Sequence, residues 1–495
     1  MPLNAQKDAN ARYAISEWPD SRNILERLRT LANELPMFQL RRDRMEEVLQ
    51  HFETRCKTSK QLNDRAREVI PGGVQHNLSF NFPFPLAIAK AEGAHLWDVD
   101  GNRYIDFLQA GGPIVLGHNY KPVREKVIAL LQECGPVTGL FHEYELKLAE
   151  LIRKHMPAVE MFRMLGSGTE AVMAAVRAAR CFTDHEYVIK VGGAYHGWSD
   201  QMVFGMRIPG TGPFDAHGIP DGCYAHTQEV FPNDLAAMES LFKENQGRGG
   251  TAAVLLEPIG PESGTRPVSR EWNQQVRAMC DQYGALLIFD EVVTGFRLGM
   301  GGAQGYFGIK PDLTIFGKVV AGGYPAAGGV GGRKEVLSTF AAGIQGSMSK
   351  RAMVGGTLSA NPLSCLAGYY AIQAMDETDA PVKAGKAGDR LTRGLIDIFQ
   401  RRNLPFVAFN HGSICHMETG AAMLMDMTNP KIFSEVNKRK HIMEEFGAAF
   451  MAEGLISLAG SRLYTSMATT DEVIDEALER FDRVFAHVEI RKEEE

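Results

Sequence analysis

Short apolar runs alternate with helical stretches through the middle of the chain, from about residue 115 to about residue 380. Examples of the runs are YVIKV at 187–191, AAVLLEP at 252–258, ALLIFDE at 285–291 and DLTIFGK at 312–318. Runs of this length that alternate with helices are typical of parallel strands buried on both faces. The pattern therefore predicts an α/β fold, with a mostly parallel sheet sandwiched between helices.

The length of the chain predicts more than one hydrophobic core. The 495 residues exceed the ~250–300 residues at which single cores stop growing. We expect a large domain at 115–384, and a smaller α+β domain formed by 58–114 together with 385–495. Residues 1–57 carry charged, leucine-containing helical patterns and are expected to form an N-terminal helical extension.

Charge and cysteine use argue against several classes of protein. A net charge of −7 argues against a protein that binds nucleic acid or an anionic membrane surface. No run approaches the ~20 apolar residues of a membrane span, and the first residues lack the pattern of a secretory signal. The seven cysteines are scattered singly, which argues against a disulfide framework or a zinc site. We expect a cytoplasmic protein that binds neither nucleic acid nor membrane and uses no metal.

Ligands of parallel sheets bind at the carboxyl ends of the strands, so the residues after each apolar run are the first candidates. After MFRML, the segment GSGTEAVMAAVRAAR at 166–180 opens an alanine-rich helix. Its N–H groups and the hydroxyls of Ser167 and Thr169 can hold a phosphate, and a capped helix without a ligand is the alternative. The segment also matches the dinucleotide pattern G-x-G-x-x-A of NAD-dependent oxidoreductases. The next strand, however, ends in glycines at 192–193 instead of the acid that this pattern requires.

Side chains suited to an aromatic ligand follow two further runs. Tyr195 and His196 lie in the loop after YVIKV, where an aromatic ring can stack on a flat ligand. Asp290 closes the run ALLIF, and a carboxylate buried there needs a cationic partner, either a protonated ring nitrogen or Arg297. Val292 is small enough to lie flat against a ring.

Lys318 ends the next run, DLTIFGK. A single lysine is most often a surface residue, but here its amine is expected to reach the same crevice as Asp290. These strand ends therefore offer a phosphate-binding helix start, an aromatic side chain for stacking, a buried acid and a desolvated amine. In that order, they suit the phosphate, the flat ring, the basic ring nitrogen and the aldehyde of pyridoxal 5′-phosphate. A lysine in such a pocket is expected to have a lowered pKa, to form a Schiff base and later to act as a base.

Several segments resemble the class III pyridoxal-phosphate aminotransferases. These segments are GSGTEAVMAAVRAAR at 166–180, AYHGWSD at 194–200, LLIFDEVVTGFRLGMGGAQGYFGIKPDLTIFGKVVAGGYPAAGGVGGR at 286–333 and GGTLSANPLS at 355–364. Within that class the chain is most similar to the glutamate-1-semialdehyde aminomutase group, which VIPGGV, DGNRYIDF and GPIVLGH also match. The resemblance covers about residues 58–490.

The resemblance implies fold-type I, with a seven-stranded, mostly parallel sheet in a large domain and a small α+β domain from both chain ends. It also implies a homodimer with shared active sites, and pyridoxal 5′-phosphate as the cofactor. Lys318 would hold the cofactor as an internal aldimine and shuttle the proton, while Asp290 would pair with the pyridine nitrogen. The other implied cofactor-binding residues are Ser167, Gly168 and Thr169 at the phosphate, Tyr195, His196 and Val292 around the ring, and Thr357 at the phosphate of the neighbouring subunit.

The segments expected to touch substrate depart from the aminomutase group. GGVQHNLSFNF at 72–82 has no arginine where that group binds the substrate carboxylate, and Gly111 stands near the place of a tryptophan. Arg462 is a candidate to bind the substrate carboxylate instead, and the alternative for it is a surface or interface arginine. Phe82 is a candidate to line an apolar substrate pocket, and the alternative for it is packing in the core or at an interface.

We therefore expect an aminotransferase that moves an amino group from an amino acid or amine donor to a keto acid or aldehyde acceptor by a ping-pong Schiff-base mechanism. A glutamate-1-semialdehyde 2,1-aminomutase and an amino-acid racemase or epimerase are the alternatives within the class. A NAD-dependent oxidoreductase is the alternative from another class.

Overall fold

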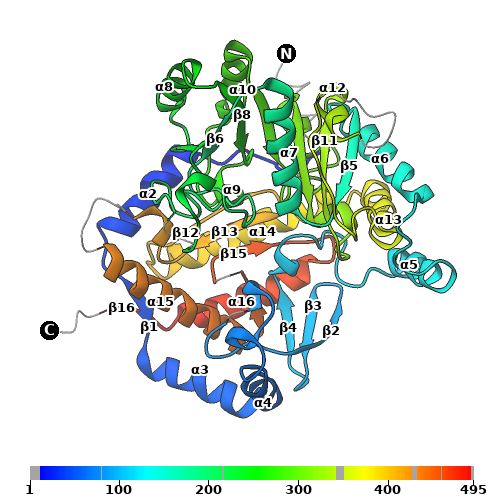
Figure 1. The fold of residues 1–495 in the computed structure, drawn as a ribbon. Coiled ribbons are helices and arrows are strands. Elements are labelled where there is room, and N and C mark those ends of the chain that lie inside the picture. Colours follow the sequence, from blue (N-terminus) through cyan, green and yellow to red (C-terminus); the bar gives the residue numbers. More distant parts are fainter. Residues whose placement is uncertain are drawn as a thin grey trace. The chain divides into compact units, whose positions relative to one another are not determined.

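The computed structural model of the protein describes residues 12–79, 81–213, 217–341, 350–425, 432–458 and 460–491. The chain divides into two compact units (Figure 1). Unit 1 comprises Met1–Ser21 and Lys121–Val382, and unit 2 comprises Arg22–Tyr120 and Lys383–Glu495. Residues 22–57 therefore fall in unit 2, and the predicted division into an extension and two domains stays a prediction.

A seven-stranded sheet forms the centre of unit 1, in the order β5-β11-β10-β9-β8-β6-β7. Figure 1 labels β5, β6, β8 and β11 of this sheet. All neighbours pair in parallel except β11, which is antiparallel to both β5 and β10. The strands are β5 Met161–Leu165, β6 Tyr187–Val191, β7 Thr227–Val230, β8 Thr251–Leu256, β9 Leu286–Asp290, β10 Leu313–Gly317 and β11 Gly328–Gly332. The mostly parallel sheet predicted from the apolar runs is confirmed.

Helices cover both faces of this sheet. One face packs against α7 (Gly168–Thr183) and α12 (Lys334–Leu337), and the other against α8 (Leu235–Gln246) and α10 (Trp272–Tyr283). Ile288 belongs to the core under α7, whereas the next residue, Phe289, belongs to the core under α10. Because successive strand residues point to opposite faces, an unbroken apolar run is what a sheet covered on both sides requires.

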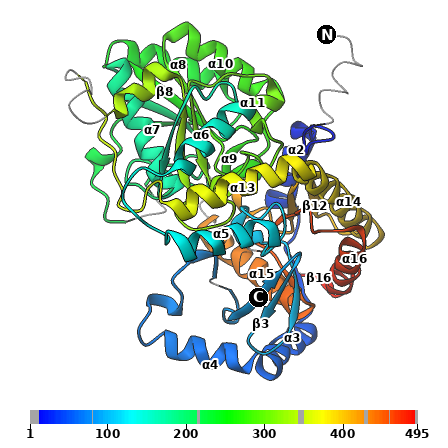
Figure 2. The same cartoon turned by 90° about the vertical axis from the view of Figure 1, so that its right-hand side faces the viewer.

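Three more helices of unit 1 pack together, as Figure 2 shows: α13 (Pro362–Thr378) contacts both α5 (Lys121–Glu133) and α6 (Glu143–His155). The same helix α13 packs against the short turn η5 (Lys318–Ala321), which directly follows β10. The unit also contains the short helices α9 (Pro261–Gly264) and α11 (Gly302–Phe307). The turn that begins with Lys318 is thus held between the sheet and a long helix.

Unit 2 combines three small sheets with long helices. The sheets are β1 (Phe38–Leu40) with β16 (Val488–Ile490); β14 (Leu455–Ile456), β4 (Arg103–Asp106), β3 (His95–Asp98) and β2 (Ile88–Glu92); and β12 (Val407–His411), β13 (Ile414–Glu418) and β15 (Arg462–Tyr464). The helices are α2 (Ser21–Asn33), α3 (Arg42–Arg55), α4 (Lys57–Ala66), α14 (Ala380–Arg401), α15 (Ile432–Ala452) and α16 (Asp471–Phe485). Each end of the chain supplies strands and helices to this α+β unit.

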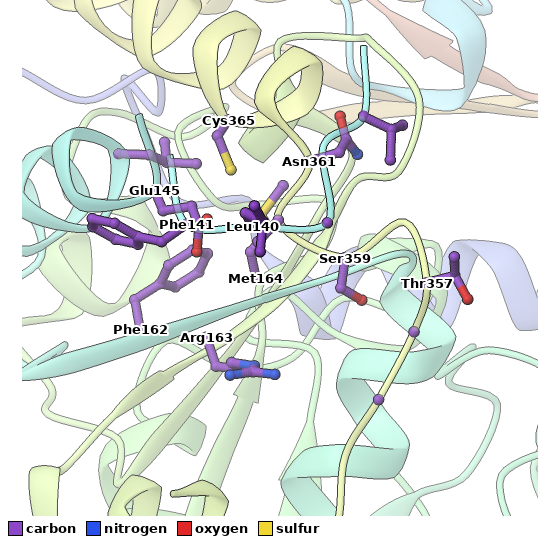
Figure 3. A pocket seen from close by; sticks show the side chains of 16 residues that line it. Leu140, Phe141, Glu145, Phe162, Arg163, Met164, Thr357, Ser359, Asn361 and Cys365 are labelled. Atoms are coloured by element: carbon purple, nitrogen blue, oxygen red, sulfur yellow. The ribbon is translucent and has the colours of Figure 1, made fainter. Parts of the chain in front are cut away.

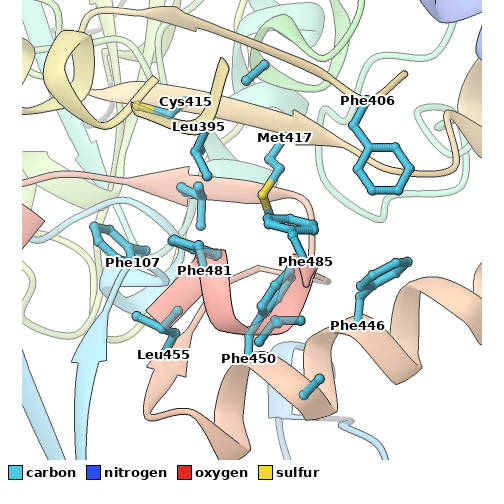
Figure 4. Packing of buried hydrophobic residues seen from close by; sticks show 14 of the residues in the cluster. Phe107, Leu395, Phe406, Cys415, Met417, Phe446, Phe450, Leu455, Phe481 and Phe485 are labelled. Carbon is cyan, nitrogen blue, oxygen red and sulfur yellow. The ribbon is translucent and has the colours of Figure 1, made fainter. Parts of the chain in front are cut away.

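One hydrophobic core joins the two ends of the chain in unit 2 (Figure 4). Phe481 and Phe450 meet edge to face with ring centroids 5.1 Å apart, and Phe107 from the N-terminal half lies against Phe481 at 6.2 Å. Val48 of α3 belongs to the same buried cluster. The small α+β domain from both chain ends, part of the predicted fold class, is therefore confirmed.

The described part of the chain offers neither a membrane-spanning helix nor a cluster of metal ligands. No helix in the described ranges is long and apolar enough to cross a bilayer. The same residues hold no group of three or more His, Cys, Asp or Glu side chains placed to bind a metal ion.

Candidate active site

Three strand ends meet at one edge of the sheet in unit 1. Gly328, at the start of β11, pairs with both Leu165 and Gly317, the last residues of β5 and β10. On the other side of β10, Ile315 pairs with Asp290, the last residue of β9. Since neighbouring strands lie ~4.8 Å apart, the segments that follow β5, β9 and β10 begin within about 15 Å of one another.

The segment after β5 opens helix α7 with free N–H groups. Ser167 is the N-cap, and its hydroxyl accepts a hydrogen bond from the N–H of Glu170 (3.2 Å). The first bond inside the helix joins the N–H of Ala171 to the carbonyl of Ser167 (3.0 Å), so the N–H groups of Gly168 and Thr169 have no acceptor within the helix. The N-terminus of a helix of 16 residues carries a partial positive charge that favours a phosphate.

Glycines at the strand ends let the segments of the site approach one another closely. A Cβ atom at Gly168 would lie 3.1 Å from Cγ2 of Val292, and one at Gly317 would lie 2.8 Å from its Cγ1. Gly197, in the loop after β6, is similarly close to the start of α7, because a Cβ there would lie 2.8 Å from Cα of Thr169. Val292 is thus enclosed between the start of α7 and the end of β10.

Asp290 and His196 form a buried pair. Oδ2 of Asp290 lies 2.7 Å from Nδ1 of His196, and Oδ1 accepts the N–H of Val292 (3.0 Å). The two side chains belong to residues only 4% and 1% exposed. Burial lowers the pKa of His196 although its hydrogen bond to Asp290 opposes this, so the ring is neutral and Nδ1–H donates to the carboxylate. Its other nitrogen, Nε2, is buried without a hydrogen-bond partner in the part of the chain that the structure describes.

Two buried charged residues that the sequence analysis missed hold the same loop. Lys190 of β6 is fully buried, and its Nζ donates to the carbonyl of Ala194 (3.4 Å) and to two further carbonyls of the loop at 2.9 and 2.7 Å. Glu257, directly after β8, accepts the N–H of Tyr195 (3.0 Å). Three buried side chains therefore fix successive residues of this loop. Lys190 holds residue 194, Glu257 holds residue 195 and Asp290 holds residue 196, and each belongs to a different strand or strand end. A charge inside a run predicted to be buried is the sequence signal that identifies Lys190 and Glu257.

Glu257 also closes a turn with an unusual backbone. Its carboxylate accepts the N–H of Glu262 (2.8 Å), the N–H of Ser263 and the hydroxyl of Ser263 (2.8 Å). Glu262 and Ser263 have φ angles of 45° and 50°, in the left-handed region that L-residues rarely adopt. Burial, with the charge of Asp290 adding to it, raises the pKa of Glu257 to about 8. Burial likewise lowers the pKa of Lys190 to about 8, against the opposing effect of the charges of Glu229 and Glu257.

Lys318 has a left-handed backbone, with φ at 45°. Such a conformation costs a non-glycine residue about 1–3 kcal/mol and persists only where the surroundings enforce it. Here helix α13 covers the turn closely. A Cβ at Gly322 would lie 2.6 Å from Cβ of Ala371, and a Cβ at Gly368 would collide with the carbonyl of Val320. The packing of α13 thus fixes the backbone from which the Lys318 amine projects.

Tyr195 and Thr357 are the more exposed candidates. Tyr195 is 46% exposed, and burial of the rest of its side chain raises the pKa of its hydroxyl. Thr357 lines a pocket of about 410 Å³, together with Leu140 and Phe141 (Figure 3). The loop that carries it lies beside the first turn of α7, since a Cβ at Gly356 would lie 3.5 Å from Oε2 of Glu170.

The two candidate substrate residues lie in unit 2. Arg462 begins β15, where it pairs with His416, and is 8% exposed. Phe82 packs edge to face against the ring of His441, with centroids 5.8 Å apart. Neither residue therefore belongs to the group of candidate cofactor-binding residues that lies in unit 1. Their roles in binding substrate stay predictions.

Known proteins resemble this chain in sequence and in fold. The family Aminotransferase class-III matches residues 79–485. Glutamate-1-semialdehyde 2,1-aminomutase 1 of Lachnoclostridium phytofermentans is 37% identical over 435 residues, which cover 86% of this chain and 98% of that protein. The crystal structure of an omega-transaminase from Sphaerobacter thermophilus matches with a TM-score of 0.77 at 29% identity, over 88% of this chain and 99% of that one. A structure described as a transaminase with PLP bound matches with a TM-score of 0.76 at 26% identity, over 87% and 97% of the two chains.

These likenesses confirm the resemblance to the class III aminotransferases and their glutamate-1-semialdehyde aminomutase-like group. They also confirm fold-type I, since the solved transaminases match this chain over nearly their whole length. The chain belongs to the class-III aminotransferase family.

Proposed function

We propose that this protein is a pyridoxal 5′-phosphate-dependent aminotransferase, which moves an amino group from an amino acid or amine donor to a keto acid or aldehyde acceptor. The observation that carries the proposal is the meeting of Lys318, Asp290 and the start of α7 at one edge of a single sheet. Membership of the class-III family adds support to this proposal. It gives no support to the alternative of a NAD-dependent oxidoreductase.

The described residues fit this cofactor. The N–H groups of Gly168 and Thr169 and the hydroxyl of Ser167 form an anion site of the kind that binds a phosphate. The buried carboxylate of Asp290 suits a protonated ring nitrogen, because a charge-assisted hydrogen bond offsets the cost of burying both charges. The exposed ring surface of Tyr195 provides a face for stacking. Val292, enclosed beside Gly168 and Gly317, is proposed to cover the other face.

When bound, pyridoxal phosphate supplies an aldehyde that condenses with primary amines and a ring that accepts the electron pair released at the substrate Cα. In our proposal Lys318 anchors the cofactor covalently. Once the donor amine has displaced it, Lys318 takes the proton from the donor's Cα, and in the second half-reaction it gives a proton to the carbon that was the acceptor's carbonyl carbon. Asp290 keeps the ring nitrogen protonated, and the neutral His196 holds the Asp290 carboxylate in place. Because donor and acceptor use one site in turn, the kinetics should be ping-pong.

A second candidate function is supported by a specific likeness. The 37% identical relative from Lachnoclostridium phytofermentans is named as a glutamate-1-semialdehyde 2,1-aminomutase, which moves the amino group within one molecule. Against it stands the segment 72–82, which has no arginine to bind a substrate carboxylate. The match to an omega-transaminase supports amine donors. We therefore favour transfer between two molecules.

We also propose that the protein works as a homodimer with shared active sites. Leu140 and Phe141 are each 78% exposed beside the pocket of Figure 3, and Met353 is 69% exposed in the segment just before Thr357. Exposed apolar side chains gathered around one pocket are typical of a surface that another chain covers. An exposed Thr357 in this surface is available to the phosphate of a neighbouring subunit, as the family resemblance implies.

Replacing Lys318 with alanine should remove the covalent attachment of the cofactor. We expect the purified wild-type protein, loaded with pyridoxal phosphate, to show a visible absorption band that an amine donor bleaches. After borohydride treatment, mass spectrometry should find the cofactor on the peptide that contains residue 318. Lys318→Ala should lose both signals and at least about 10²–10⁴-fold in activity. Lys310→Ala, which removes an exposed lysine of the same unit, is the matched control, and cofactor found on another lysine would refute the proposal.

Substrate screening separates the two candidate functions. Wild-type protein should transfer amino groups between separate donors and keto acids, with parallel lines in double-reciprocal plots. Glutamate-1-semialdehyde should be converted to 5-aminolevulinate with a kcat/KM at least about tenfold lower than that of the best donor, because a missing charged hydrogen bond costs about 1.5–3 kcal/mol. A higher kcat/KM for this compound than for every donor tested would establish the aminomutase instead.

A charge in the exposed apolar surface should weaken the proposed dimer. Phe141→Asp is expected to raise the dissociation constant of the dimer at least about 30-fold, since buried aromatic anchors contribute about 2 kcal/mol or more at interfaces. Analytical ultracentrifugation over a range of concentrations measures this constant. Phe231→Asp, at another exposed phenylalanine of unit 1 (53% exposed), should leave it unchanged. Equal behaviour of the two variants would place the interface elsewhere.

A further inference from the structure

The segment that precedes the family match has a defined place in unit 1. We call residues 12–18 the N-terminal arm. Within it, the N–H of Ala14 donates to the carbonyl of Leu298 (2.9 Å), and Tyr13 forms an isolated antiparallel bridge with Gly299. Ala14 and Ile15 are only 2% and 1% exposed. The arm is therefore built into the unit, although it lies outside the matched range 79–485.

The side chain of Tyr13 fills a slot formed by three glycines. A Cβ at Gly299 would lie 2.6 Å from Cδ1 of Tyr13, and one at Gly301 would lie 2.8 Å from its hydroxyl oxygen. A Cβ at Gly305 would collide with the same hydroxyl. The ring also meets Tyr306 edge to face at 5.7 Å. Side chains at these three positions would push the ring out, so ring and slot are matched in shape.

A second aromatic residue anchors the other end of the arm. Trp18 stacks on Tyr306 with centroids 5.9 Å apart and meets Phe307 edge to face at 5.1 Å. Its Nε1–H donates to the carbonyl of Val268 (3.2 Å). Trp18 thus extends the core that underlies one face of the sheet, and the arm is fixed at both ends.

The loop beneath the arm begins directly after Asp290. This loop, residues 291–301, joins β9 to α11. Glu291 is 1% exposed and closes the base of the loop, because its carboxylate accepts the N–H groups of Ala303 (2.6 Å) and Gln304 (3.1 Å). Burial raises the pKa of Tyr13, and the charge of Glu291 raises it further, so Tyr13 lies within electrostatic reach of this carboxylate.

We propose that the N-terminal arm positions the active site: by filling the glycine slot, Tyr13 holds the loop 291–301 and the start of α11, and through them Asp290 and Val292, in place for catalysis. The inference rests on the proposed aminotransferase function. Tyr13 acts through the loop, so it is a positioning residue. A displacement of about 1 Å, even from a change far from the chemistry, can cost about 10²-fold in rate.

Four variants test the slot contact by a double-mutant cycle. Tyr13→Ala and Gly305→Ala should each lower kcat by about 10-fold to 100-fold with little change in the KM of the donor, whereas Tyr13→Phe, which keeps the ring, should behave as wild type. Gly305 has an ordinary helical backbone, so alanine there is harmful only if Tyr13 fills the slot. Gly305→Ala should therefore have no further effect in the Tyr13→Ala background.

A second readout does not depend on activity. In the cofactor-free protein, amide hydrogen exchange of the peptides covering 291–304 should be at least about tenfold faster in Tyr13→Ala and Gly305→Ala than in wild type, because the loop loses its cover. Wild-type kcat and wild-type exchange in both variants would overturn the inference. If Tyr13→Ala does not fold, the comparison of kcat and of hydrogen exchange between Gly305→Ala and Tyr13→Phe tests the inference instead. Failure of the proposed function itself is distinguishable, since wild-type protein would then lack the visible band.

Discussion

The site depends on a carboxylate that is buried at the end of a strand. Asp290 is 4% exposed, and an ion in such a place is tolerated only when hydrogen bonds satisfy it. The neutral ring of His196 and the N–H of Val292 supply those bonds. Each of these partners is itself fixed in the fold, His196 by the loop after β6 and Val292 by its contacts with Gly168 and Gly317. The need to satisfy one charge thus ties the ends of β5, β6, β9 and β10 together.

The same principle extends along the loop that carries Tyr195. Lys190 holds residue 194, Glu257 holds residue 195 and Asp290 holds residue 196, and all three charged residues are buried. Half-satisfied buried networks are costly, whereas fully bonded ones make a site rigid. Rigidity before binding is what electrostatic catalysis requires, because groups that are already in place need no reorganisation during the reaction.

The sequence predicts the parts of the fold and site that are local, and misses those that depend on distant contacts. Apolar runs buried on both faces predicted the sheet, and the rule that ligands bind at strand ends led to Asp290 and Lys318. Lys190 and Glu257 stand as charged residues in apolar runs, but the backbone N–H and carbonyl groups that they bond leave no mark on the sequence, so their roles were missed. The slot for Tyr13 was missed because its three glycines stand nearly three hundred residues further along the chain. The antiparallel strand β11 inside the sheet, rich in glycine, also lacks the apolar signal by which its neighbours were found.

The most direct test of the central claim is the turnover of Asp290→Asn. This substitution keeps the shape of the side chain and removes its charge, so binding of pyridoxal phosphate should survive while the electrostatic support of the ring is lost. We predict that kcat falls by about 10²-fold or more, with the amount of bound cofactor and the KM of the amino donor close to those of the wild type. A variant that turns over at the wild-type rate would contradict the central role of the buried carboxylate.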